Sequence, residues 1–410
     1  MNKLLQNLFA ILFPFFPLLA WAYHFVTEKP IELALNVLLM PVAVYLLTSS
    51  KKAMPKYLIF FIIFTCYHLA SVLINDTIPA GTNSIYFLLS DLNLFACTLF
   101  IIIENTIFEE KFISRMNRNI FIIIVLTLVV SLIQIKNPEF LFNVRLLEGD
   151  ELEFWGDEVR NTAFYSWVST NSIGITFPIL IAIALSFYDT KKMLFPLLIL
   201  SGIIVSFLTK SRYVMLSVII VFSQLFFATT KSLMRKVSLV FVFGASIFLI
   251  IYAADAAGFD IDEVISSRIL EKDTDMNSAK ARVTSYEVFL IKFPENPWLG
   301  VGPKTRSDVI ALLNGEAPLI HIGYLSYLYF YGIIGCSFLF IAIYYLLKNA
   351  WVVGKKYNFW GSFYGLITFF VANTTLVYFI FSEMGIVLAV IYLRYYNLNS
   401  EIRSDSDGIE

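Results

Sequence analysis

Apolar segments long enough to cross a membrane recur along almost the whole of this chain of 410 residues. A transmembrane helix needs about 20 consecutive, mostly apolar residues. Twelve segments fit this pattern: 4–22, 31–48, 57–74, 83–103, 119–135, 162–188, 193–209, 213–229, 237–254, 321–347, 358–376 and 378–396. The chain is therefore predicted to be an all-α polytopic membrane protein with about 12 transmembrane helices.

The composition agrees with this prediction. Hydrophobic residues make up 58% of the chain and charged residues 15%, and the mean hydropathy is +0.75. Soluble domains carry roughly 25% charged residues. The net charge of −1 gives no sign of a nucleic-acid partner. The three cysteines lie inside apolar segments without the spacing of metal ligands, so we expect them to be small core residues.

Lys and Arg residues in the short connections predict the orientation of the chain, because such residues favour the cytoplasmic side. They follow the second, fourth, sixth, eighth and tenth segments. All of these are even-numbered connections, so they share one side, the cytoplasm, with both termini. The long connections 136–160 and 255–320 then lie outside. Each has a net charge of −4, from three positive and seven negative residues and from seven positive and eleven negative residues, respectively.

This pattern divides the chain into four parts. They are nine helices with an outer loop at 136–160 (residues 1–254), a large periplasmic loop (255–320), three helices (321–398) and a polar tail expected to be disordered (399–410). The segments 260–272 and 279–293 are predicted to be helices in the periplasmic loop. Apolar residues recur at near-helical spacing in the second, which predicts that it lies in the membrane interface.

The first apolar segment also has the features of a cleaved signal peptide. Lys3 precedes the apolar run, and small residues flank Trp21 at its end. We expect the segment to be retained as the first transmembrane helix.

Two cations in a very short outer turn oppose the positive-inside trend. They are Lys210 and Arg212, in the run L-T-K-S-R-Y at 208–213. One interpretation is that they reach lipid headgroups. The other is that a guanidinium at the membrane surface binds phosphate, which Arg does through two parallel hydrogen bonds.

Three further cations lie in the periplasmic loop. Arg282 begins the predicted interfacial helix, and Lys304 and Arg306 follow a Gly-Val-Gly turn at 300–302. Each is either a solvated charge or part of an anion site. The turn is not a P-loop, since no Lys-Ser or Lys-Thr pair follows it.

His321 lies where the polar loop meets the tenth apolar segment. It is a headgroup contact, a general base that works near neutral pH, or a group that orients a phosphate. If it is not the proton acceptor, a carboxylate of the outer loops or Glu383 takes that role. His68 and Asp91 are predicted to lie about 9 and 12 Å below the outer surface, where adjacent antiparallel helices can pair them. That pair is either structural or functional.

No metal or other cofactor is expected. Pairs of the form Asp-x-Asp at 260–262 and 273–275 arise easily in an acidic loop, and Cys and His residues form no cluster in the sequence.

Four runs resemble, in order and placement, the O-antigen polymerase and O-antigen ligase family of bacterial surface polysaccharide assembly. The first two are R-N-T-A-F-Y-S-W-V-S-T-N (160–171) and T-K-S-R (209–212). The third is A-R-V-T-S-Y-E-V-F-L-I-K-F-P-E-N-P-W-L-G-V-G (281–302). The last is H-I-G-Y-L-S-Y-L-Y-F-Y-G-I-I-G (321–335).

The resemblance implies a GT-C-like membrane fold and a metal-independent glycosyltransferase with an undecaprenyl-diphosphate-linked oligosaccharide donor. It implies that Arg212 and Arg282 contact the diphosphate and that His321 lies near the reacting hydroxyl, which makes these three the candidate catalytic residues. The candidate substrate-binding residues are Arg160, Asn171, Lys210, Lys304, Arg306 and Tyr324.

We therefore predict an O-antigen polymerase at the periplasmic face of the bacterial inner membrane, with membrane lipid and a chain-length regulator protein as further partners. Ligases of this family often carry Asn directly after the His, and Ile322 stands there instead. A ligase that transfers the glycan to lipid A core or to a protein is one alternative. A flippase or other transporter is another, although transporters show repeats or broken helices near the midplane and the sequence shows neither.

Overall fold

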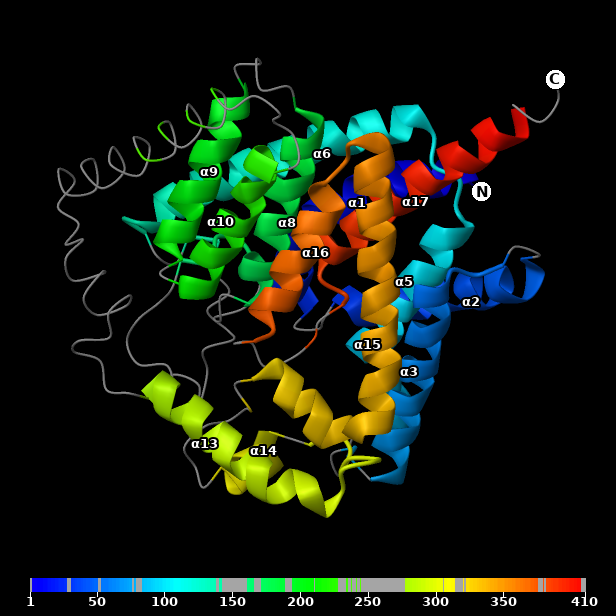
Figure 1. Cartoon of the computed structure of the whole chain (residues 1–410), viewed down its shortest axis with the longest axis vertical. Helices are drawn as coiled ribbons and strands as arrows, with labels where there is room; N and C mark the ends of the chain where they lie inside the picture. Colours follow the sequence, from blue (N-terminus) through cyan, green and yellow to red (C-terminus); the bar gives the residue numbers. More distant parts are fainter. Residues whose placement is uncertain are drawn as a thin grey trace.

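The computed structural model describes most of the chain, and its described residues form helices and no strand (Figure 1), so the predicted all-α class is confirmed. They are 2–27, 31–50, 53–75, 77–78, 83–137, 140–141, 161–165, 171–188, 194–209, 211–227, 234, 237, 241, 244, 277–304, 306–313, 320, 322–374, 379 and 381–406. Only the backbone is described at 2–5, 8, 171, 212, 277–281, 306–307 and 399–406.

The helices follow the predicted segments closely. They are α1 (Asn2–Thr27), α2 (Ile31–Ser49), α3 (Lys56–Ile74), α4 (Ser84–Leu89), α5 (Leu92–Asn105), α6 (Glu110–Gln134), α8 (Asn171–Phe187), α9 (Leu194–Leu208), α10 (Arg212–Phe227), α13 (Asn277–Lys292), η3 (Phe293–Glu295), α14 (Arg306–Leu312), α15 (Gly323–Tyr357), α16 (Gly361–Ala372) and α17 (Met384–Ser406).

Several of these helices have the length and composition of a membrane span. Five described helices, in α1, α2, α3, α6 and α15, are long and apolar enough to cross a membrane, and six shorter ones are also apolar. The ninth predicted segment, 237–254, and the predicted helix 260–272 lie largely or wholly outside the described residues. The chain is a multi-pass membrane protein, and the count of twelve spans stays a prediction. The tail prediction was wrong for 399–406, because α17 continues to Ser406.

Helix α8 lies at the centre of the packing. Its side chains are buried from Ser172 to Leu185, and it packs against α6, α9, α10, α16 and α17. A helix that is apolar on all sides is expected to be surrounded by other helices in this way.

Helices α8, α10 and α17 begin at the same end of the molecule. Tyr213, in the first turn of α10, lies against Gly174 in the first turn of α8, and Gly385 at the start of α17 lies against Thr176. Farther along, the side-chain amide of Gln224 donates to the carbonyl oxygen of Ala182 at 3.1 Å. At the other end of α8, the ring of Phe187 stacks on Tyr392 of α17. The three helices therefore run parallel, and the N-terminal turns of α10 and α17 each pack against that of α8.

Helix α15 is broken at Gly332, whose φ of 59° and ψ of −170° are not helical. The break leaves the carbonyl groups of Tyr329 and Phe330, and the amides of Ile333 and Ile334, without their helical partners. The turn at 297–302 supplies replacements. Its amides at 301 and 302 donate to the two carbonyls at 3.1 and 2.9 Å, and its carbonyls at 297 and 298 accept from the two amides at 2.8 and 3.0 Å.

Close approach of the two backbones requires glycine at this junction. Gly300 (φ 73°) and Gly332 adopt positive φ, and a Cβ on either would clash with the backbone of the other segment. The amides of Val301 and Gly302 donate to carbonyl groups of α15, so they do not form a phosphate-binding loop.

The fourth predicted segment is also broken, between α4 and α5. The side chain of Asn36 in α2 donates to the carbonyl of Leu89 at 2.9 Å, and Asp91 caps α5 by accepting from the amide of Leu94 at 2.8 Å. The expectation of unbroken spans was therefore wrong at two positions. Hydropathy does not reveal the break at Gly332, because the residues around it are apolar. At the other break Ser90, Asp91 and Asn93 are polar, but the flanking residues are apolar enough for the whole segment to be predicted as one span.

A buried set of hydrogen bonds joins the two breaks. His68 in α3 lies 2.6 Å from Asp91 through Nε2 and 2.7 Å from the hydroxyl of Tyr331 through Nδ1. The hydroxyl of Tyr67 donates to the carbonyl oxygen of Leu299 at 2.7 Å. The predicted pairing of His68 with Asp91 is confirmed, and it fastens α3, α5 and α15 together.

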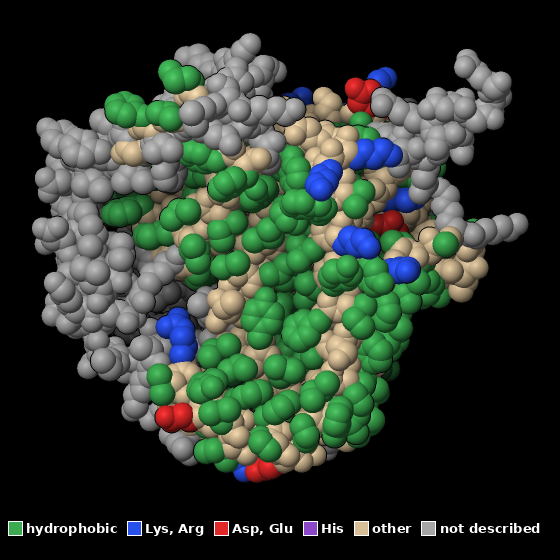
Figure 2. Space-filling model, viewed as in Figure 1, with side chains coloured by type: hydrophobic (Ala, Val, Ile, Leu, Met, Phe, Trp, Pro, Cys, Tyr) green, Lys and Arg blue, Asp and Glu red, His purple; other side chains and the backbone are tan. Residues whose placement is uncertain are grey.

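Cations gather at the opposite end of α3 and α15 from the 297–302 turn. Lys56, at the start of α3, lies 5.4 Å from the ring centre of Tyr345, and Lys355 and Lys356 occupy the last turn of α15. Most Lys and Arg side chains visible in Figure 2 lie in its upper half, above a broad apolar surface. Helices α13 and α14 lie at the lower end in Figure 1.

Candidate functional site

A half-buried carboxylate lies where the N-terminal turns of α8 and α17 meet. It belongs to Glu383, the residue directly before α17, whose carbonyl oxygen accepts from the amide of Ile386 at 2.9 Å. A capping carboxylate commonly accepts hydrogen bonds from the first amides of its own helix. The side chain of Glu383 points instead to α8.

Two hydroxyl groups of α8 hold one oxygen of this carboxylate. Ser172 and Thr176 donate to Oε2 of Glu383 at 3.0 and 2.9 Å. The two donors are four residues apart, which places them on one face of the helix. Among the described residues, Oε1 accepts no hydrogen bond and Glu383 makes no ion pair.

Arg212 begins the helix that packs against the same turn of α8. The predicted tight turn is confirmed, because α9 ends at Leu208 and α10 begins at Arg212. Tyr213, the next residue, lies against Gly174. In the sequence, Gly174 stands between the two donors, Ser172 and Thr176. Gly174 is two residues from each donor and therefore lies on the opposite face of α8. The backbone of Arg212 is thus at the same end of α8 as Glu383 but across the helix from it, and the side chain of Arg212 lies outside the described atoms.

The cations of the periplasmic loop lie on α13, α14 and the segment between them. Arg282 is half-buried on α13, next to the buried Ser285. Lys304 is half-buried directly after the turn that docks into α15, and Arg306 begins α14. The predicted contact of Arg282 with the diphosphate, and of Lys304 and Arg306 with the substrate, stays a prediction.

Several predicted site residues lie outside the described part of the structure. His321, Arg160 and Lys210 are among them, and Asn171 is described only as the first backbone position of α8. Their roles therefore stay predictions.

The side chain of Tyr324, predicted to bind substrate, makes its contacts with other residues of the protein. Its hydroxyl donates to the carbonyl oxygen of Phe370 at 2.7 Å, and its ring packs edge-on against Phe379 at 4.9 Å. The hydroxyl of Tyr327 donates to the carbonyl of Phe379 at 3.0 Å. These bonds fasten the first turn of α15, which begins two residues after His321, to the segment that leads to Glu383.

The predicted helix at 279–293 is confirmed as α13 and η3. Val283, Tyr286 and Leu290 are exposed on it, whereas Phe289 and Phe293 are half-buried and stack at 4.7 Å. An exposed apolar face is compatible with the predicted place in the membrane interface.

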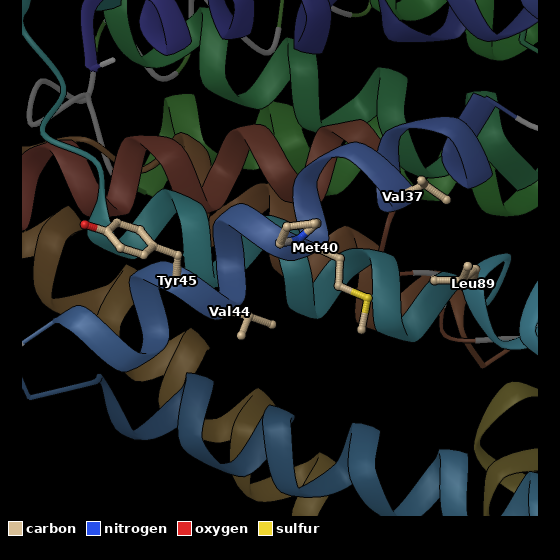
Figure 3. Close-up of a pocket in the computed structure, with 6 residues that line it drawn as sticks. Val37, Met40, Val44, Tyr45 and Leu89 are labelled. Atoms are coloured by element: carbon tan, nitrogen blue, oxygen red, sulfur yellow. The ribbon is translucent and has the colours of Figure 1, made fainter.

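An apolar groove of about 550 Å³ lies on the surface of α2 (Figure 3). Its lining is Val37, Met40, Pro41, Val44, Tyr45 and Leu89. The lining has no charged side chain, so the groove is unsuited to binding a diphosphate. No group of three or more His, Cys, Asp or Glu side chains that could hold a metal ion occurs within the described ranges.

Residues 195–340 match the O-antigen ligase family. No curated protein matches the chain. The match confirms the resemblance predicted from the sequence and contains Arg212, Arg282 and His321. Glu383 lies beyond its end. An O-antigen ligase domain indicates an enzyme of the polymerase or ligase type that acts in surface polysaccharide assembly in a membrane.

Sequence reasoning named Glu383 only as an alternative proton acceptor and did not identify Ser172 or Thr176. One signal was present. Two hydroxyl residues four positions apart open an apolar segment, and a carboxylate interrupts another. Nothing in the local sequence shows that these two segments are neighbours.

Proposed function

We propose that this chain polymerises undecaprenyl-diphosphate-linked oligosaccharide repeats at the periplasmic face of the bacterial inner membrane. The observation that carries the proposal is the meeting of the α8, α10 and α17 N-terminal turns within and beside the O-antigen ligase domain. The helix of Arg212 and the carboxylate of Glu383 both contact the first turn of α8, from different sides of that helix.

The chemistry needs two kinds of group. A lipid diphosphate is already a good leaving group, so the enzyme must hold its negative charge and remove a proton from a sugar hydroxyl. Arg212 and Arg282 hold the diphosphate in this proposal, and His321 or a carboxylate accepts the proton. Lys210, Lys304, Arg306, Arg160, Asn171 and Tyr324 are the further residues proposed to bind substrate.

The orientation of the helices supports the periplasmic assignment. Lys56 and the last turn of α15 lie at one end of α3 and α15, and the 297–302 turn lies at the other. The positive-inside rule makes the first end cytoplasmic. Both termini are then cytoplasmic, and the acidic loop that contains the turn is periplasmic.

A ligase that attaches the glycan to lipid A core or to a protein is the second candidate, since the matched family bears that description. Ile322, in place of the Asn that often follows the His in ligases, favours the polymerase. The glycans of a deletion strain separate these functions. Single repeats on the core indicate a polymerase, absence of attached glycan indicates a ligase, and lipid-linked repeats that accumulate in the cytoplasm indicate a flippase.

The diphosphate site has its own test. Arg212→Ala and Arg212→Lys are both expected to shorten the polymer strongly, because an ammonium cannot replace the two-pronged guanidinium. If Arg212 and Arg282 bind one diphosphate, the double alanine variant loses little beyond either single variant. Fully additive losses would show that the two residues serve separate sites. Activity that EDTA abolishes and magnesium restores would overturn a metal-independent mechanism.

A further inference from the structure

We propose that Glu383 binds the hydroxyl group of the acceptor sugar through Oε1 and accepts its proton during glycosyl transfer. This inference rests on the proposed function and selects, between His321 and a carboxylate, the group that takes the proton.

The hydrogen bonds of Glu383 favour this role. Ser172 and Thr176 both bind Oε2, at 3.0 and 2.9 Å, and thereby hold the carboxylate in one orientation. Within the described structure Oε1 accepts no hydrogen bond, so it is available to a sugar hydroxyl. A general base must be held in place and must keep one basic atom within hydrogen-bond reach of the proton it abstracts.

The surroundings of Glu383 point the same way. No Lys or Arg among the described residues forms an ion pair with it, whereas Glu104, a largely buried carboxylate of α5, pairs with Arg394 at 3.7 Å. A carboxylate whose charge is neutralised by a cation is a weaker base.

The location also suits a transfer reaction. The turn of α8 that carries Ser172 and Thr176 contacts Tyr213, the residue after Arg212. Gly174, the residue that Tyr213 contacts, lies on the face of α8 opposite Ser172 and Thr176, so Arg212 and Glu383 are at the same end of α8 and on different sides of it. A diphosphate bound at Arg212 and a hydroxyl bound at Glu383 would therefore lie at the same level along this helix.

The acceptor hydroxyl oxygen forms a bond to the anomeric carbon of the donor, and the bond from that carbon to the phosphate oxygen breaks. Undecaprenyl diphosphate leaves with the electron pair. The hydroxyl proton moves to Oε1 of Glu383, which later releases it to water.

The test uses the full-length protein in nanodiscs, with lipid-linked oligosaccharides extracted from a strain that lacks this chain as both donor and acceptor. The rate of chain extension, donor binding and melting temperature are measured for wild type, Glu383→Gln and Glu104→Gln. Glu383→Gln is expected to slow extension by about 100-fold or more, because an amide keeps the shape but cannot accept the proton. Its donor binding and melting temperature should stay near wild type. Glu104→Gln, the matched control, should lower the melting temperature and keep the extension rate.

Extension by Glu383→Gln within about threefold of wild type would overturn the inference. If that variant does not fold, the double variant Ser172→Ala with Thr176→Val decides. This variant keeps the carboxylate but removes both hydroxyl groups that hold it in one orientation. Unchanged extension would overturn the inference, and about tenfold slower extension would support it. A wild-type protein that transfers nothing from the lipid-linked donor would refute the proposed function itself, and the inference with it.

Discussion

Two carboxylates, Asp91 and Glu383, occupy the same kind of position in this protein, yet their hydrogen bonds differ. Each precedes a helix at a break between two apolar segments. Both oxygens of Asp91 are used, one by the amide of Leu94 and one by His68. Glu383 uses only Oε2 among the described residues.

The difference separates a structural group from a candidate catalytic one. The bonds of Asp91, His68 and Tyr331 form a closed network that connects three helices. A satisfied buried network makes a fold rigid and specific. A carboxylate with one fixed and one available oxygen can bind a ligand instead. Of two intramembrane carboxylates, the one with spare hydrogen-bonding capacity is therefore the better candidate for chemistry.

The largest effect on the fold is expected where the 297–302 turn docks into α15. Gly332→Ala should cost about 3 kcal/mol or more, because its backbone conformation suits only glycine and a Cβ would clash with the carbonyl of Trp298. The melting temperature and the yield of folded protein in detergent measure the loss. Gly244→Ala is the control, since a Cβ there meets nothing within 4 Å. Equal melting temperatures for the two variants would show that the docking contributes nothing to stability.

A smaller loss is expected from the closed network. His68→Ala removes a partner from both Asp91 and Tyr331, and breaking a buried pair in this way costs about 3 kcal/mol at most where one partner is partly exposed. Thermal unfolding should show it. Glu383→Gln provides the comparison, because that variant should lose activity and keep its melting temperature. The reverse result, a stable His68→Ala and an unstable Glu383→Gln, would show that Glu383 is the structural group and that the His68–Asp91 pair is not.

Removing one donor from Glu383 should have a modest effect. Ser172→Ala leaves Thr176 bound to Oε2, so stability should fall by about 1 kcal/mol. Extension should slow by less than in Glu383→Gln. A greater activity loss in Ser172→Ala than in Glu383→Gln would assign the reacting proton to the hydroxyl.

The smallest effect is expected at the exposed ion pair between Lys292 and Glu295. Glu295 accepts a hydrogen bond from Lys292 at 2.9 Å, and both the bond and the charge of Glu295 raise the pKa of Lys292. Exposed ion pairs contribute little to stability. Lys292→Ala should therefore leave the melting temperature and the extension rate unchanged. A clear drop in either would mean that α13 and η3 depend on this pair.

Much of the helical arrangement was predictable from the sequence. Apolar length predicted the helices, because a segment in lipid must bury its own backbone polar groups. The depth of His68 and Asp91 along two neighbouring segments predicted their pairing, which the 2.6 Å contact confirms. The order of the Arg and His motifs predicted the O-antigen ligase family.

The tertiary structure alone decided which polar groups are satisfied. Gly332 is an ordinary glycine in an apolar run until the 297–302 turn supplies the hydrogen bonds that its break requires. Ser172 and Glu383 are 211 residues apart, and His68 and Tyr331 are 263 residues apart. Hydrophobic patterning is a local property that specifies where helices form. Whether a buried carboxylate is closed off or left with a free oxygen depends on partners that the fold brings from distant segments.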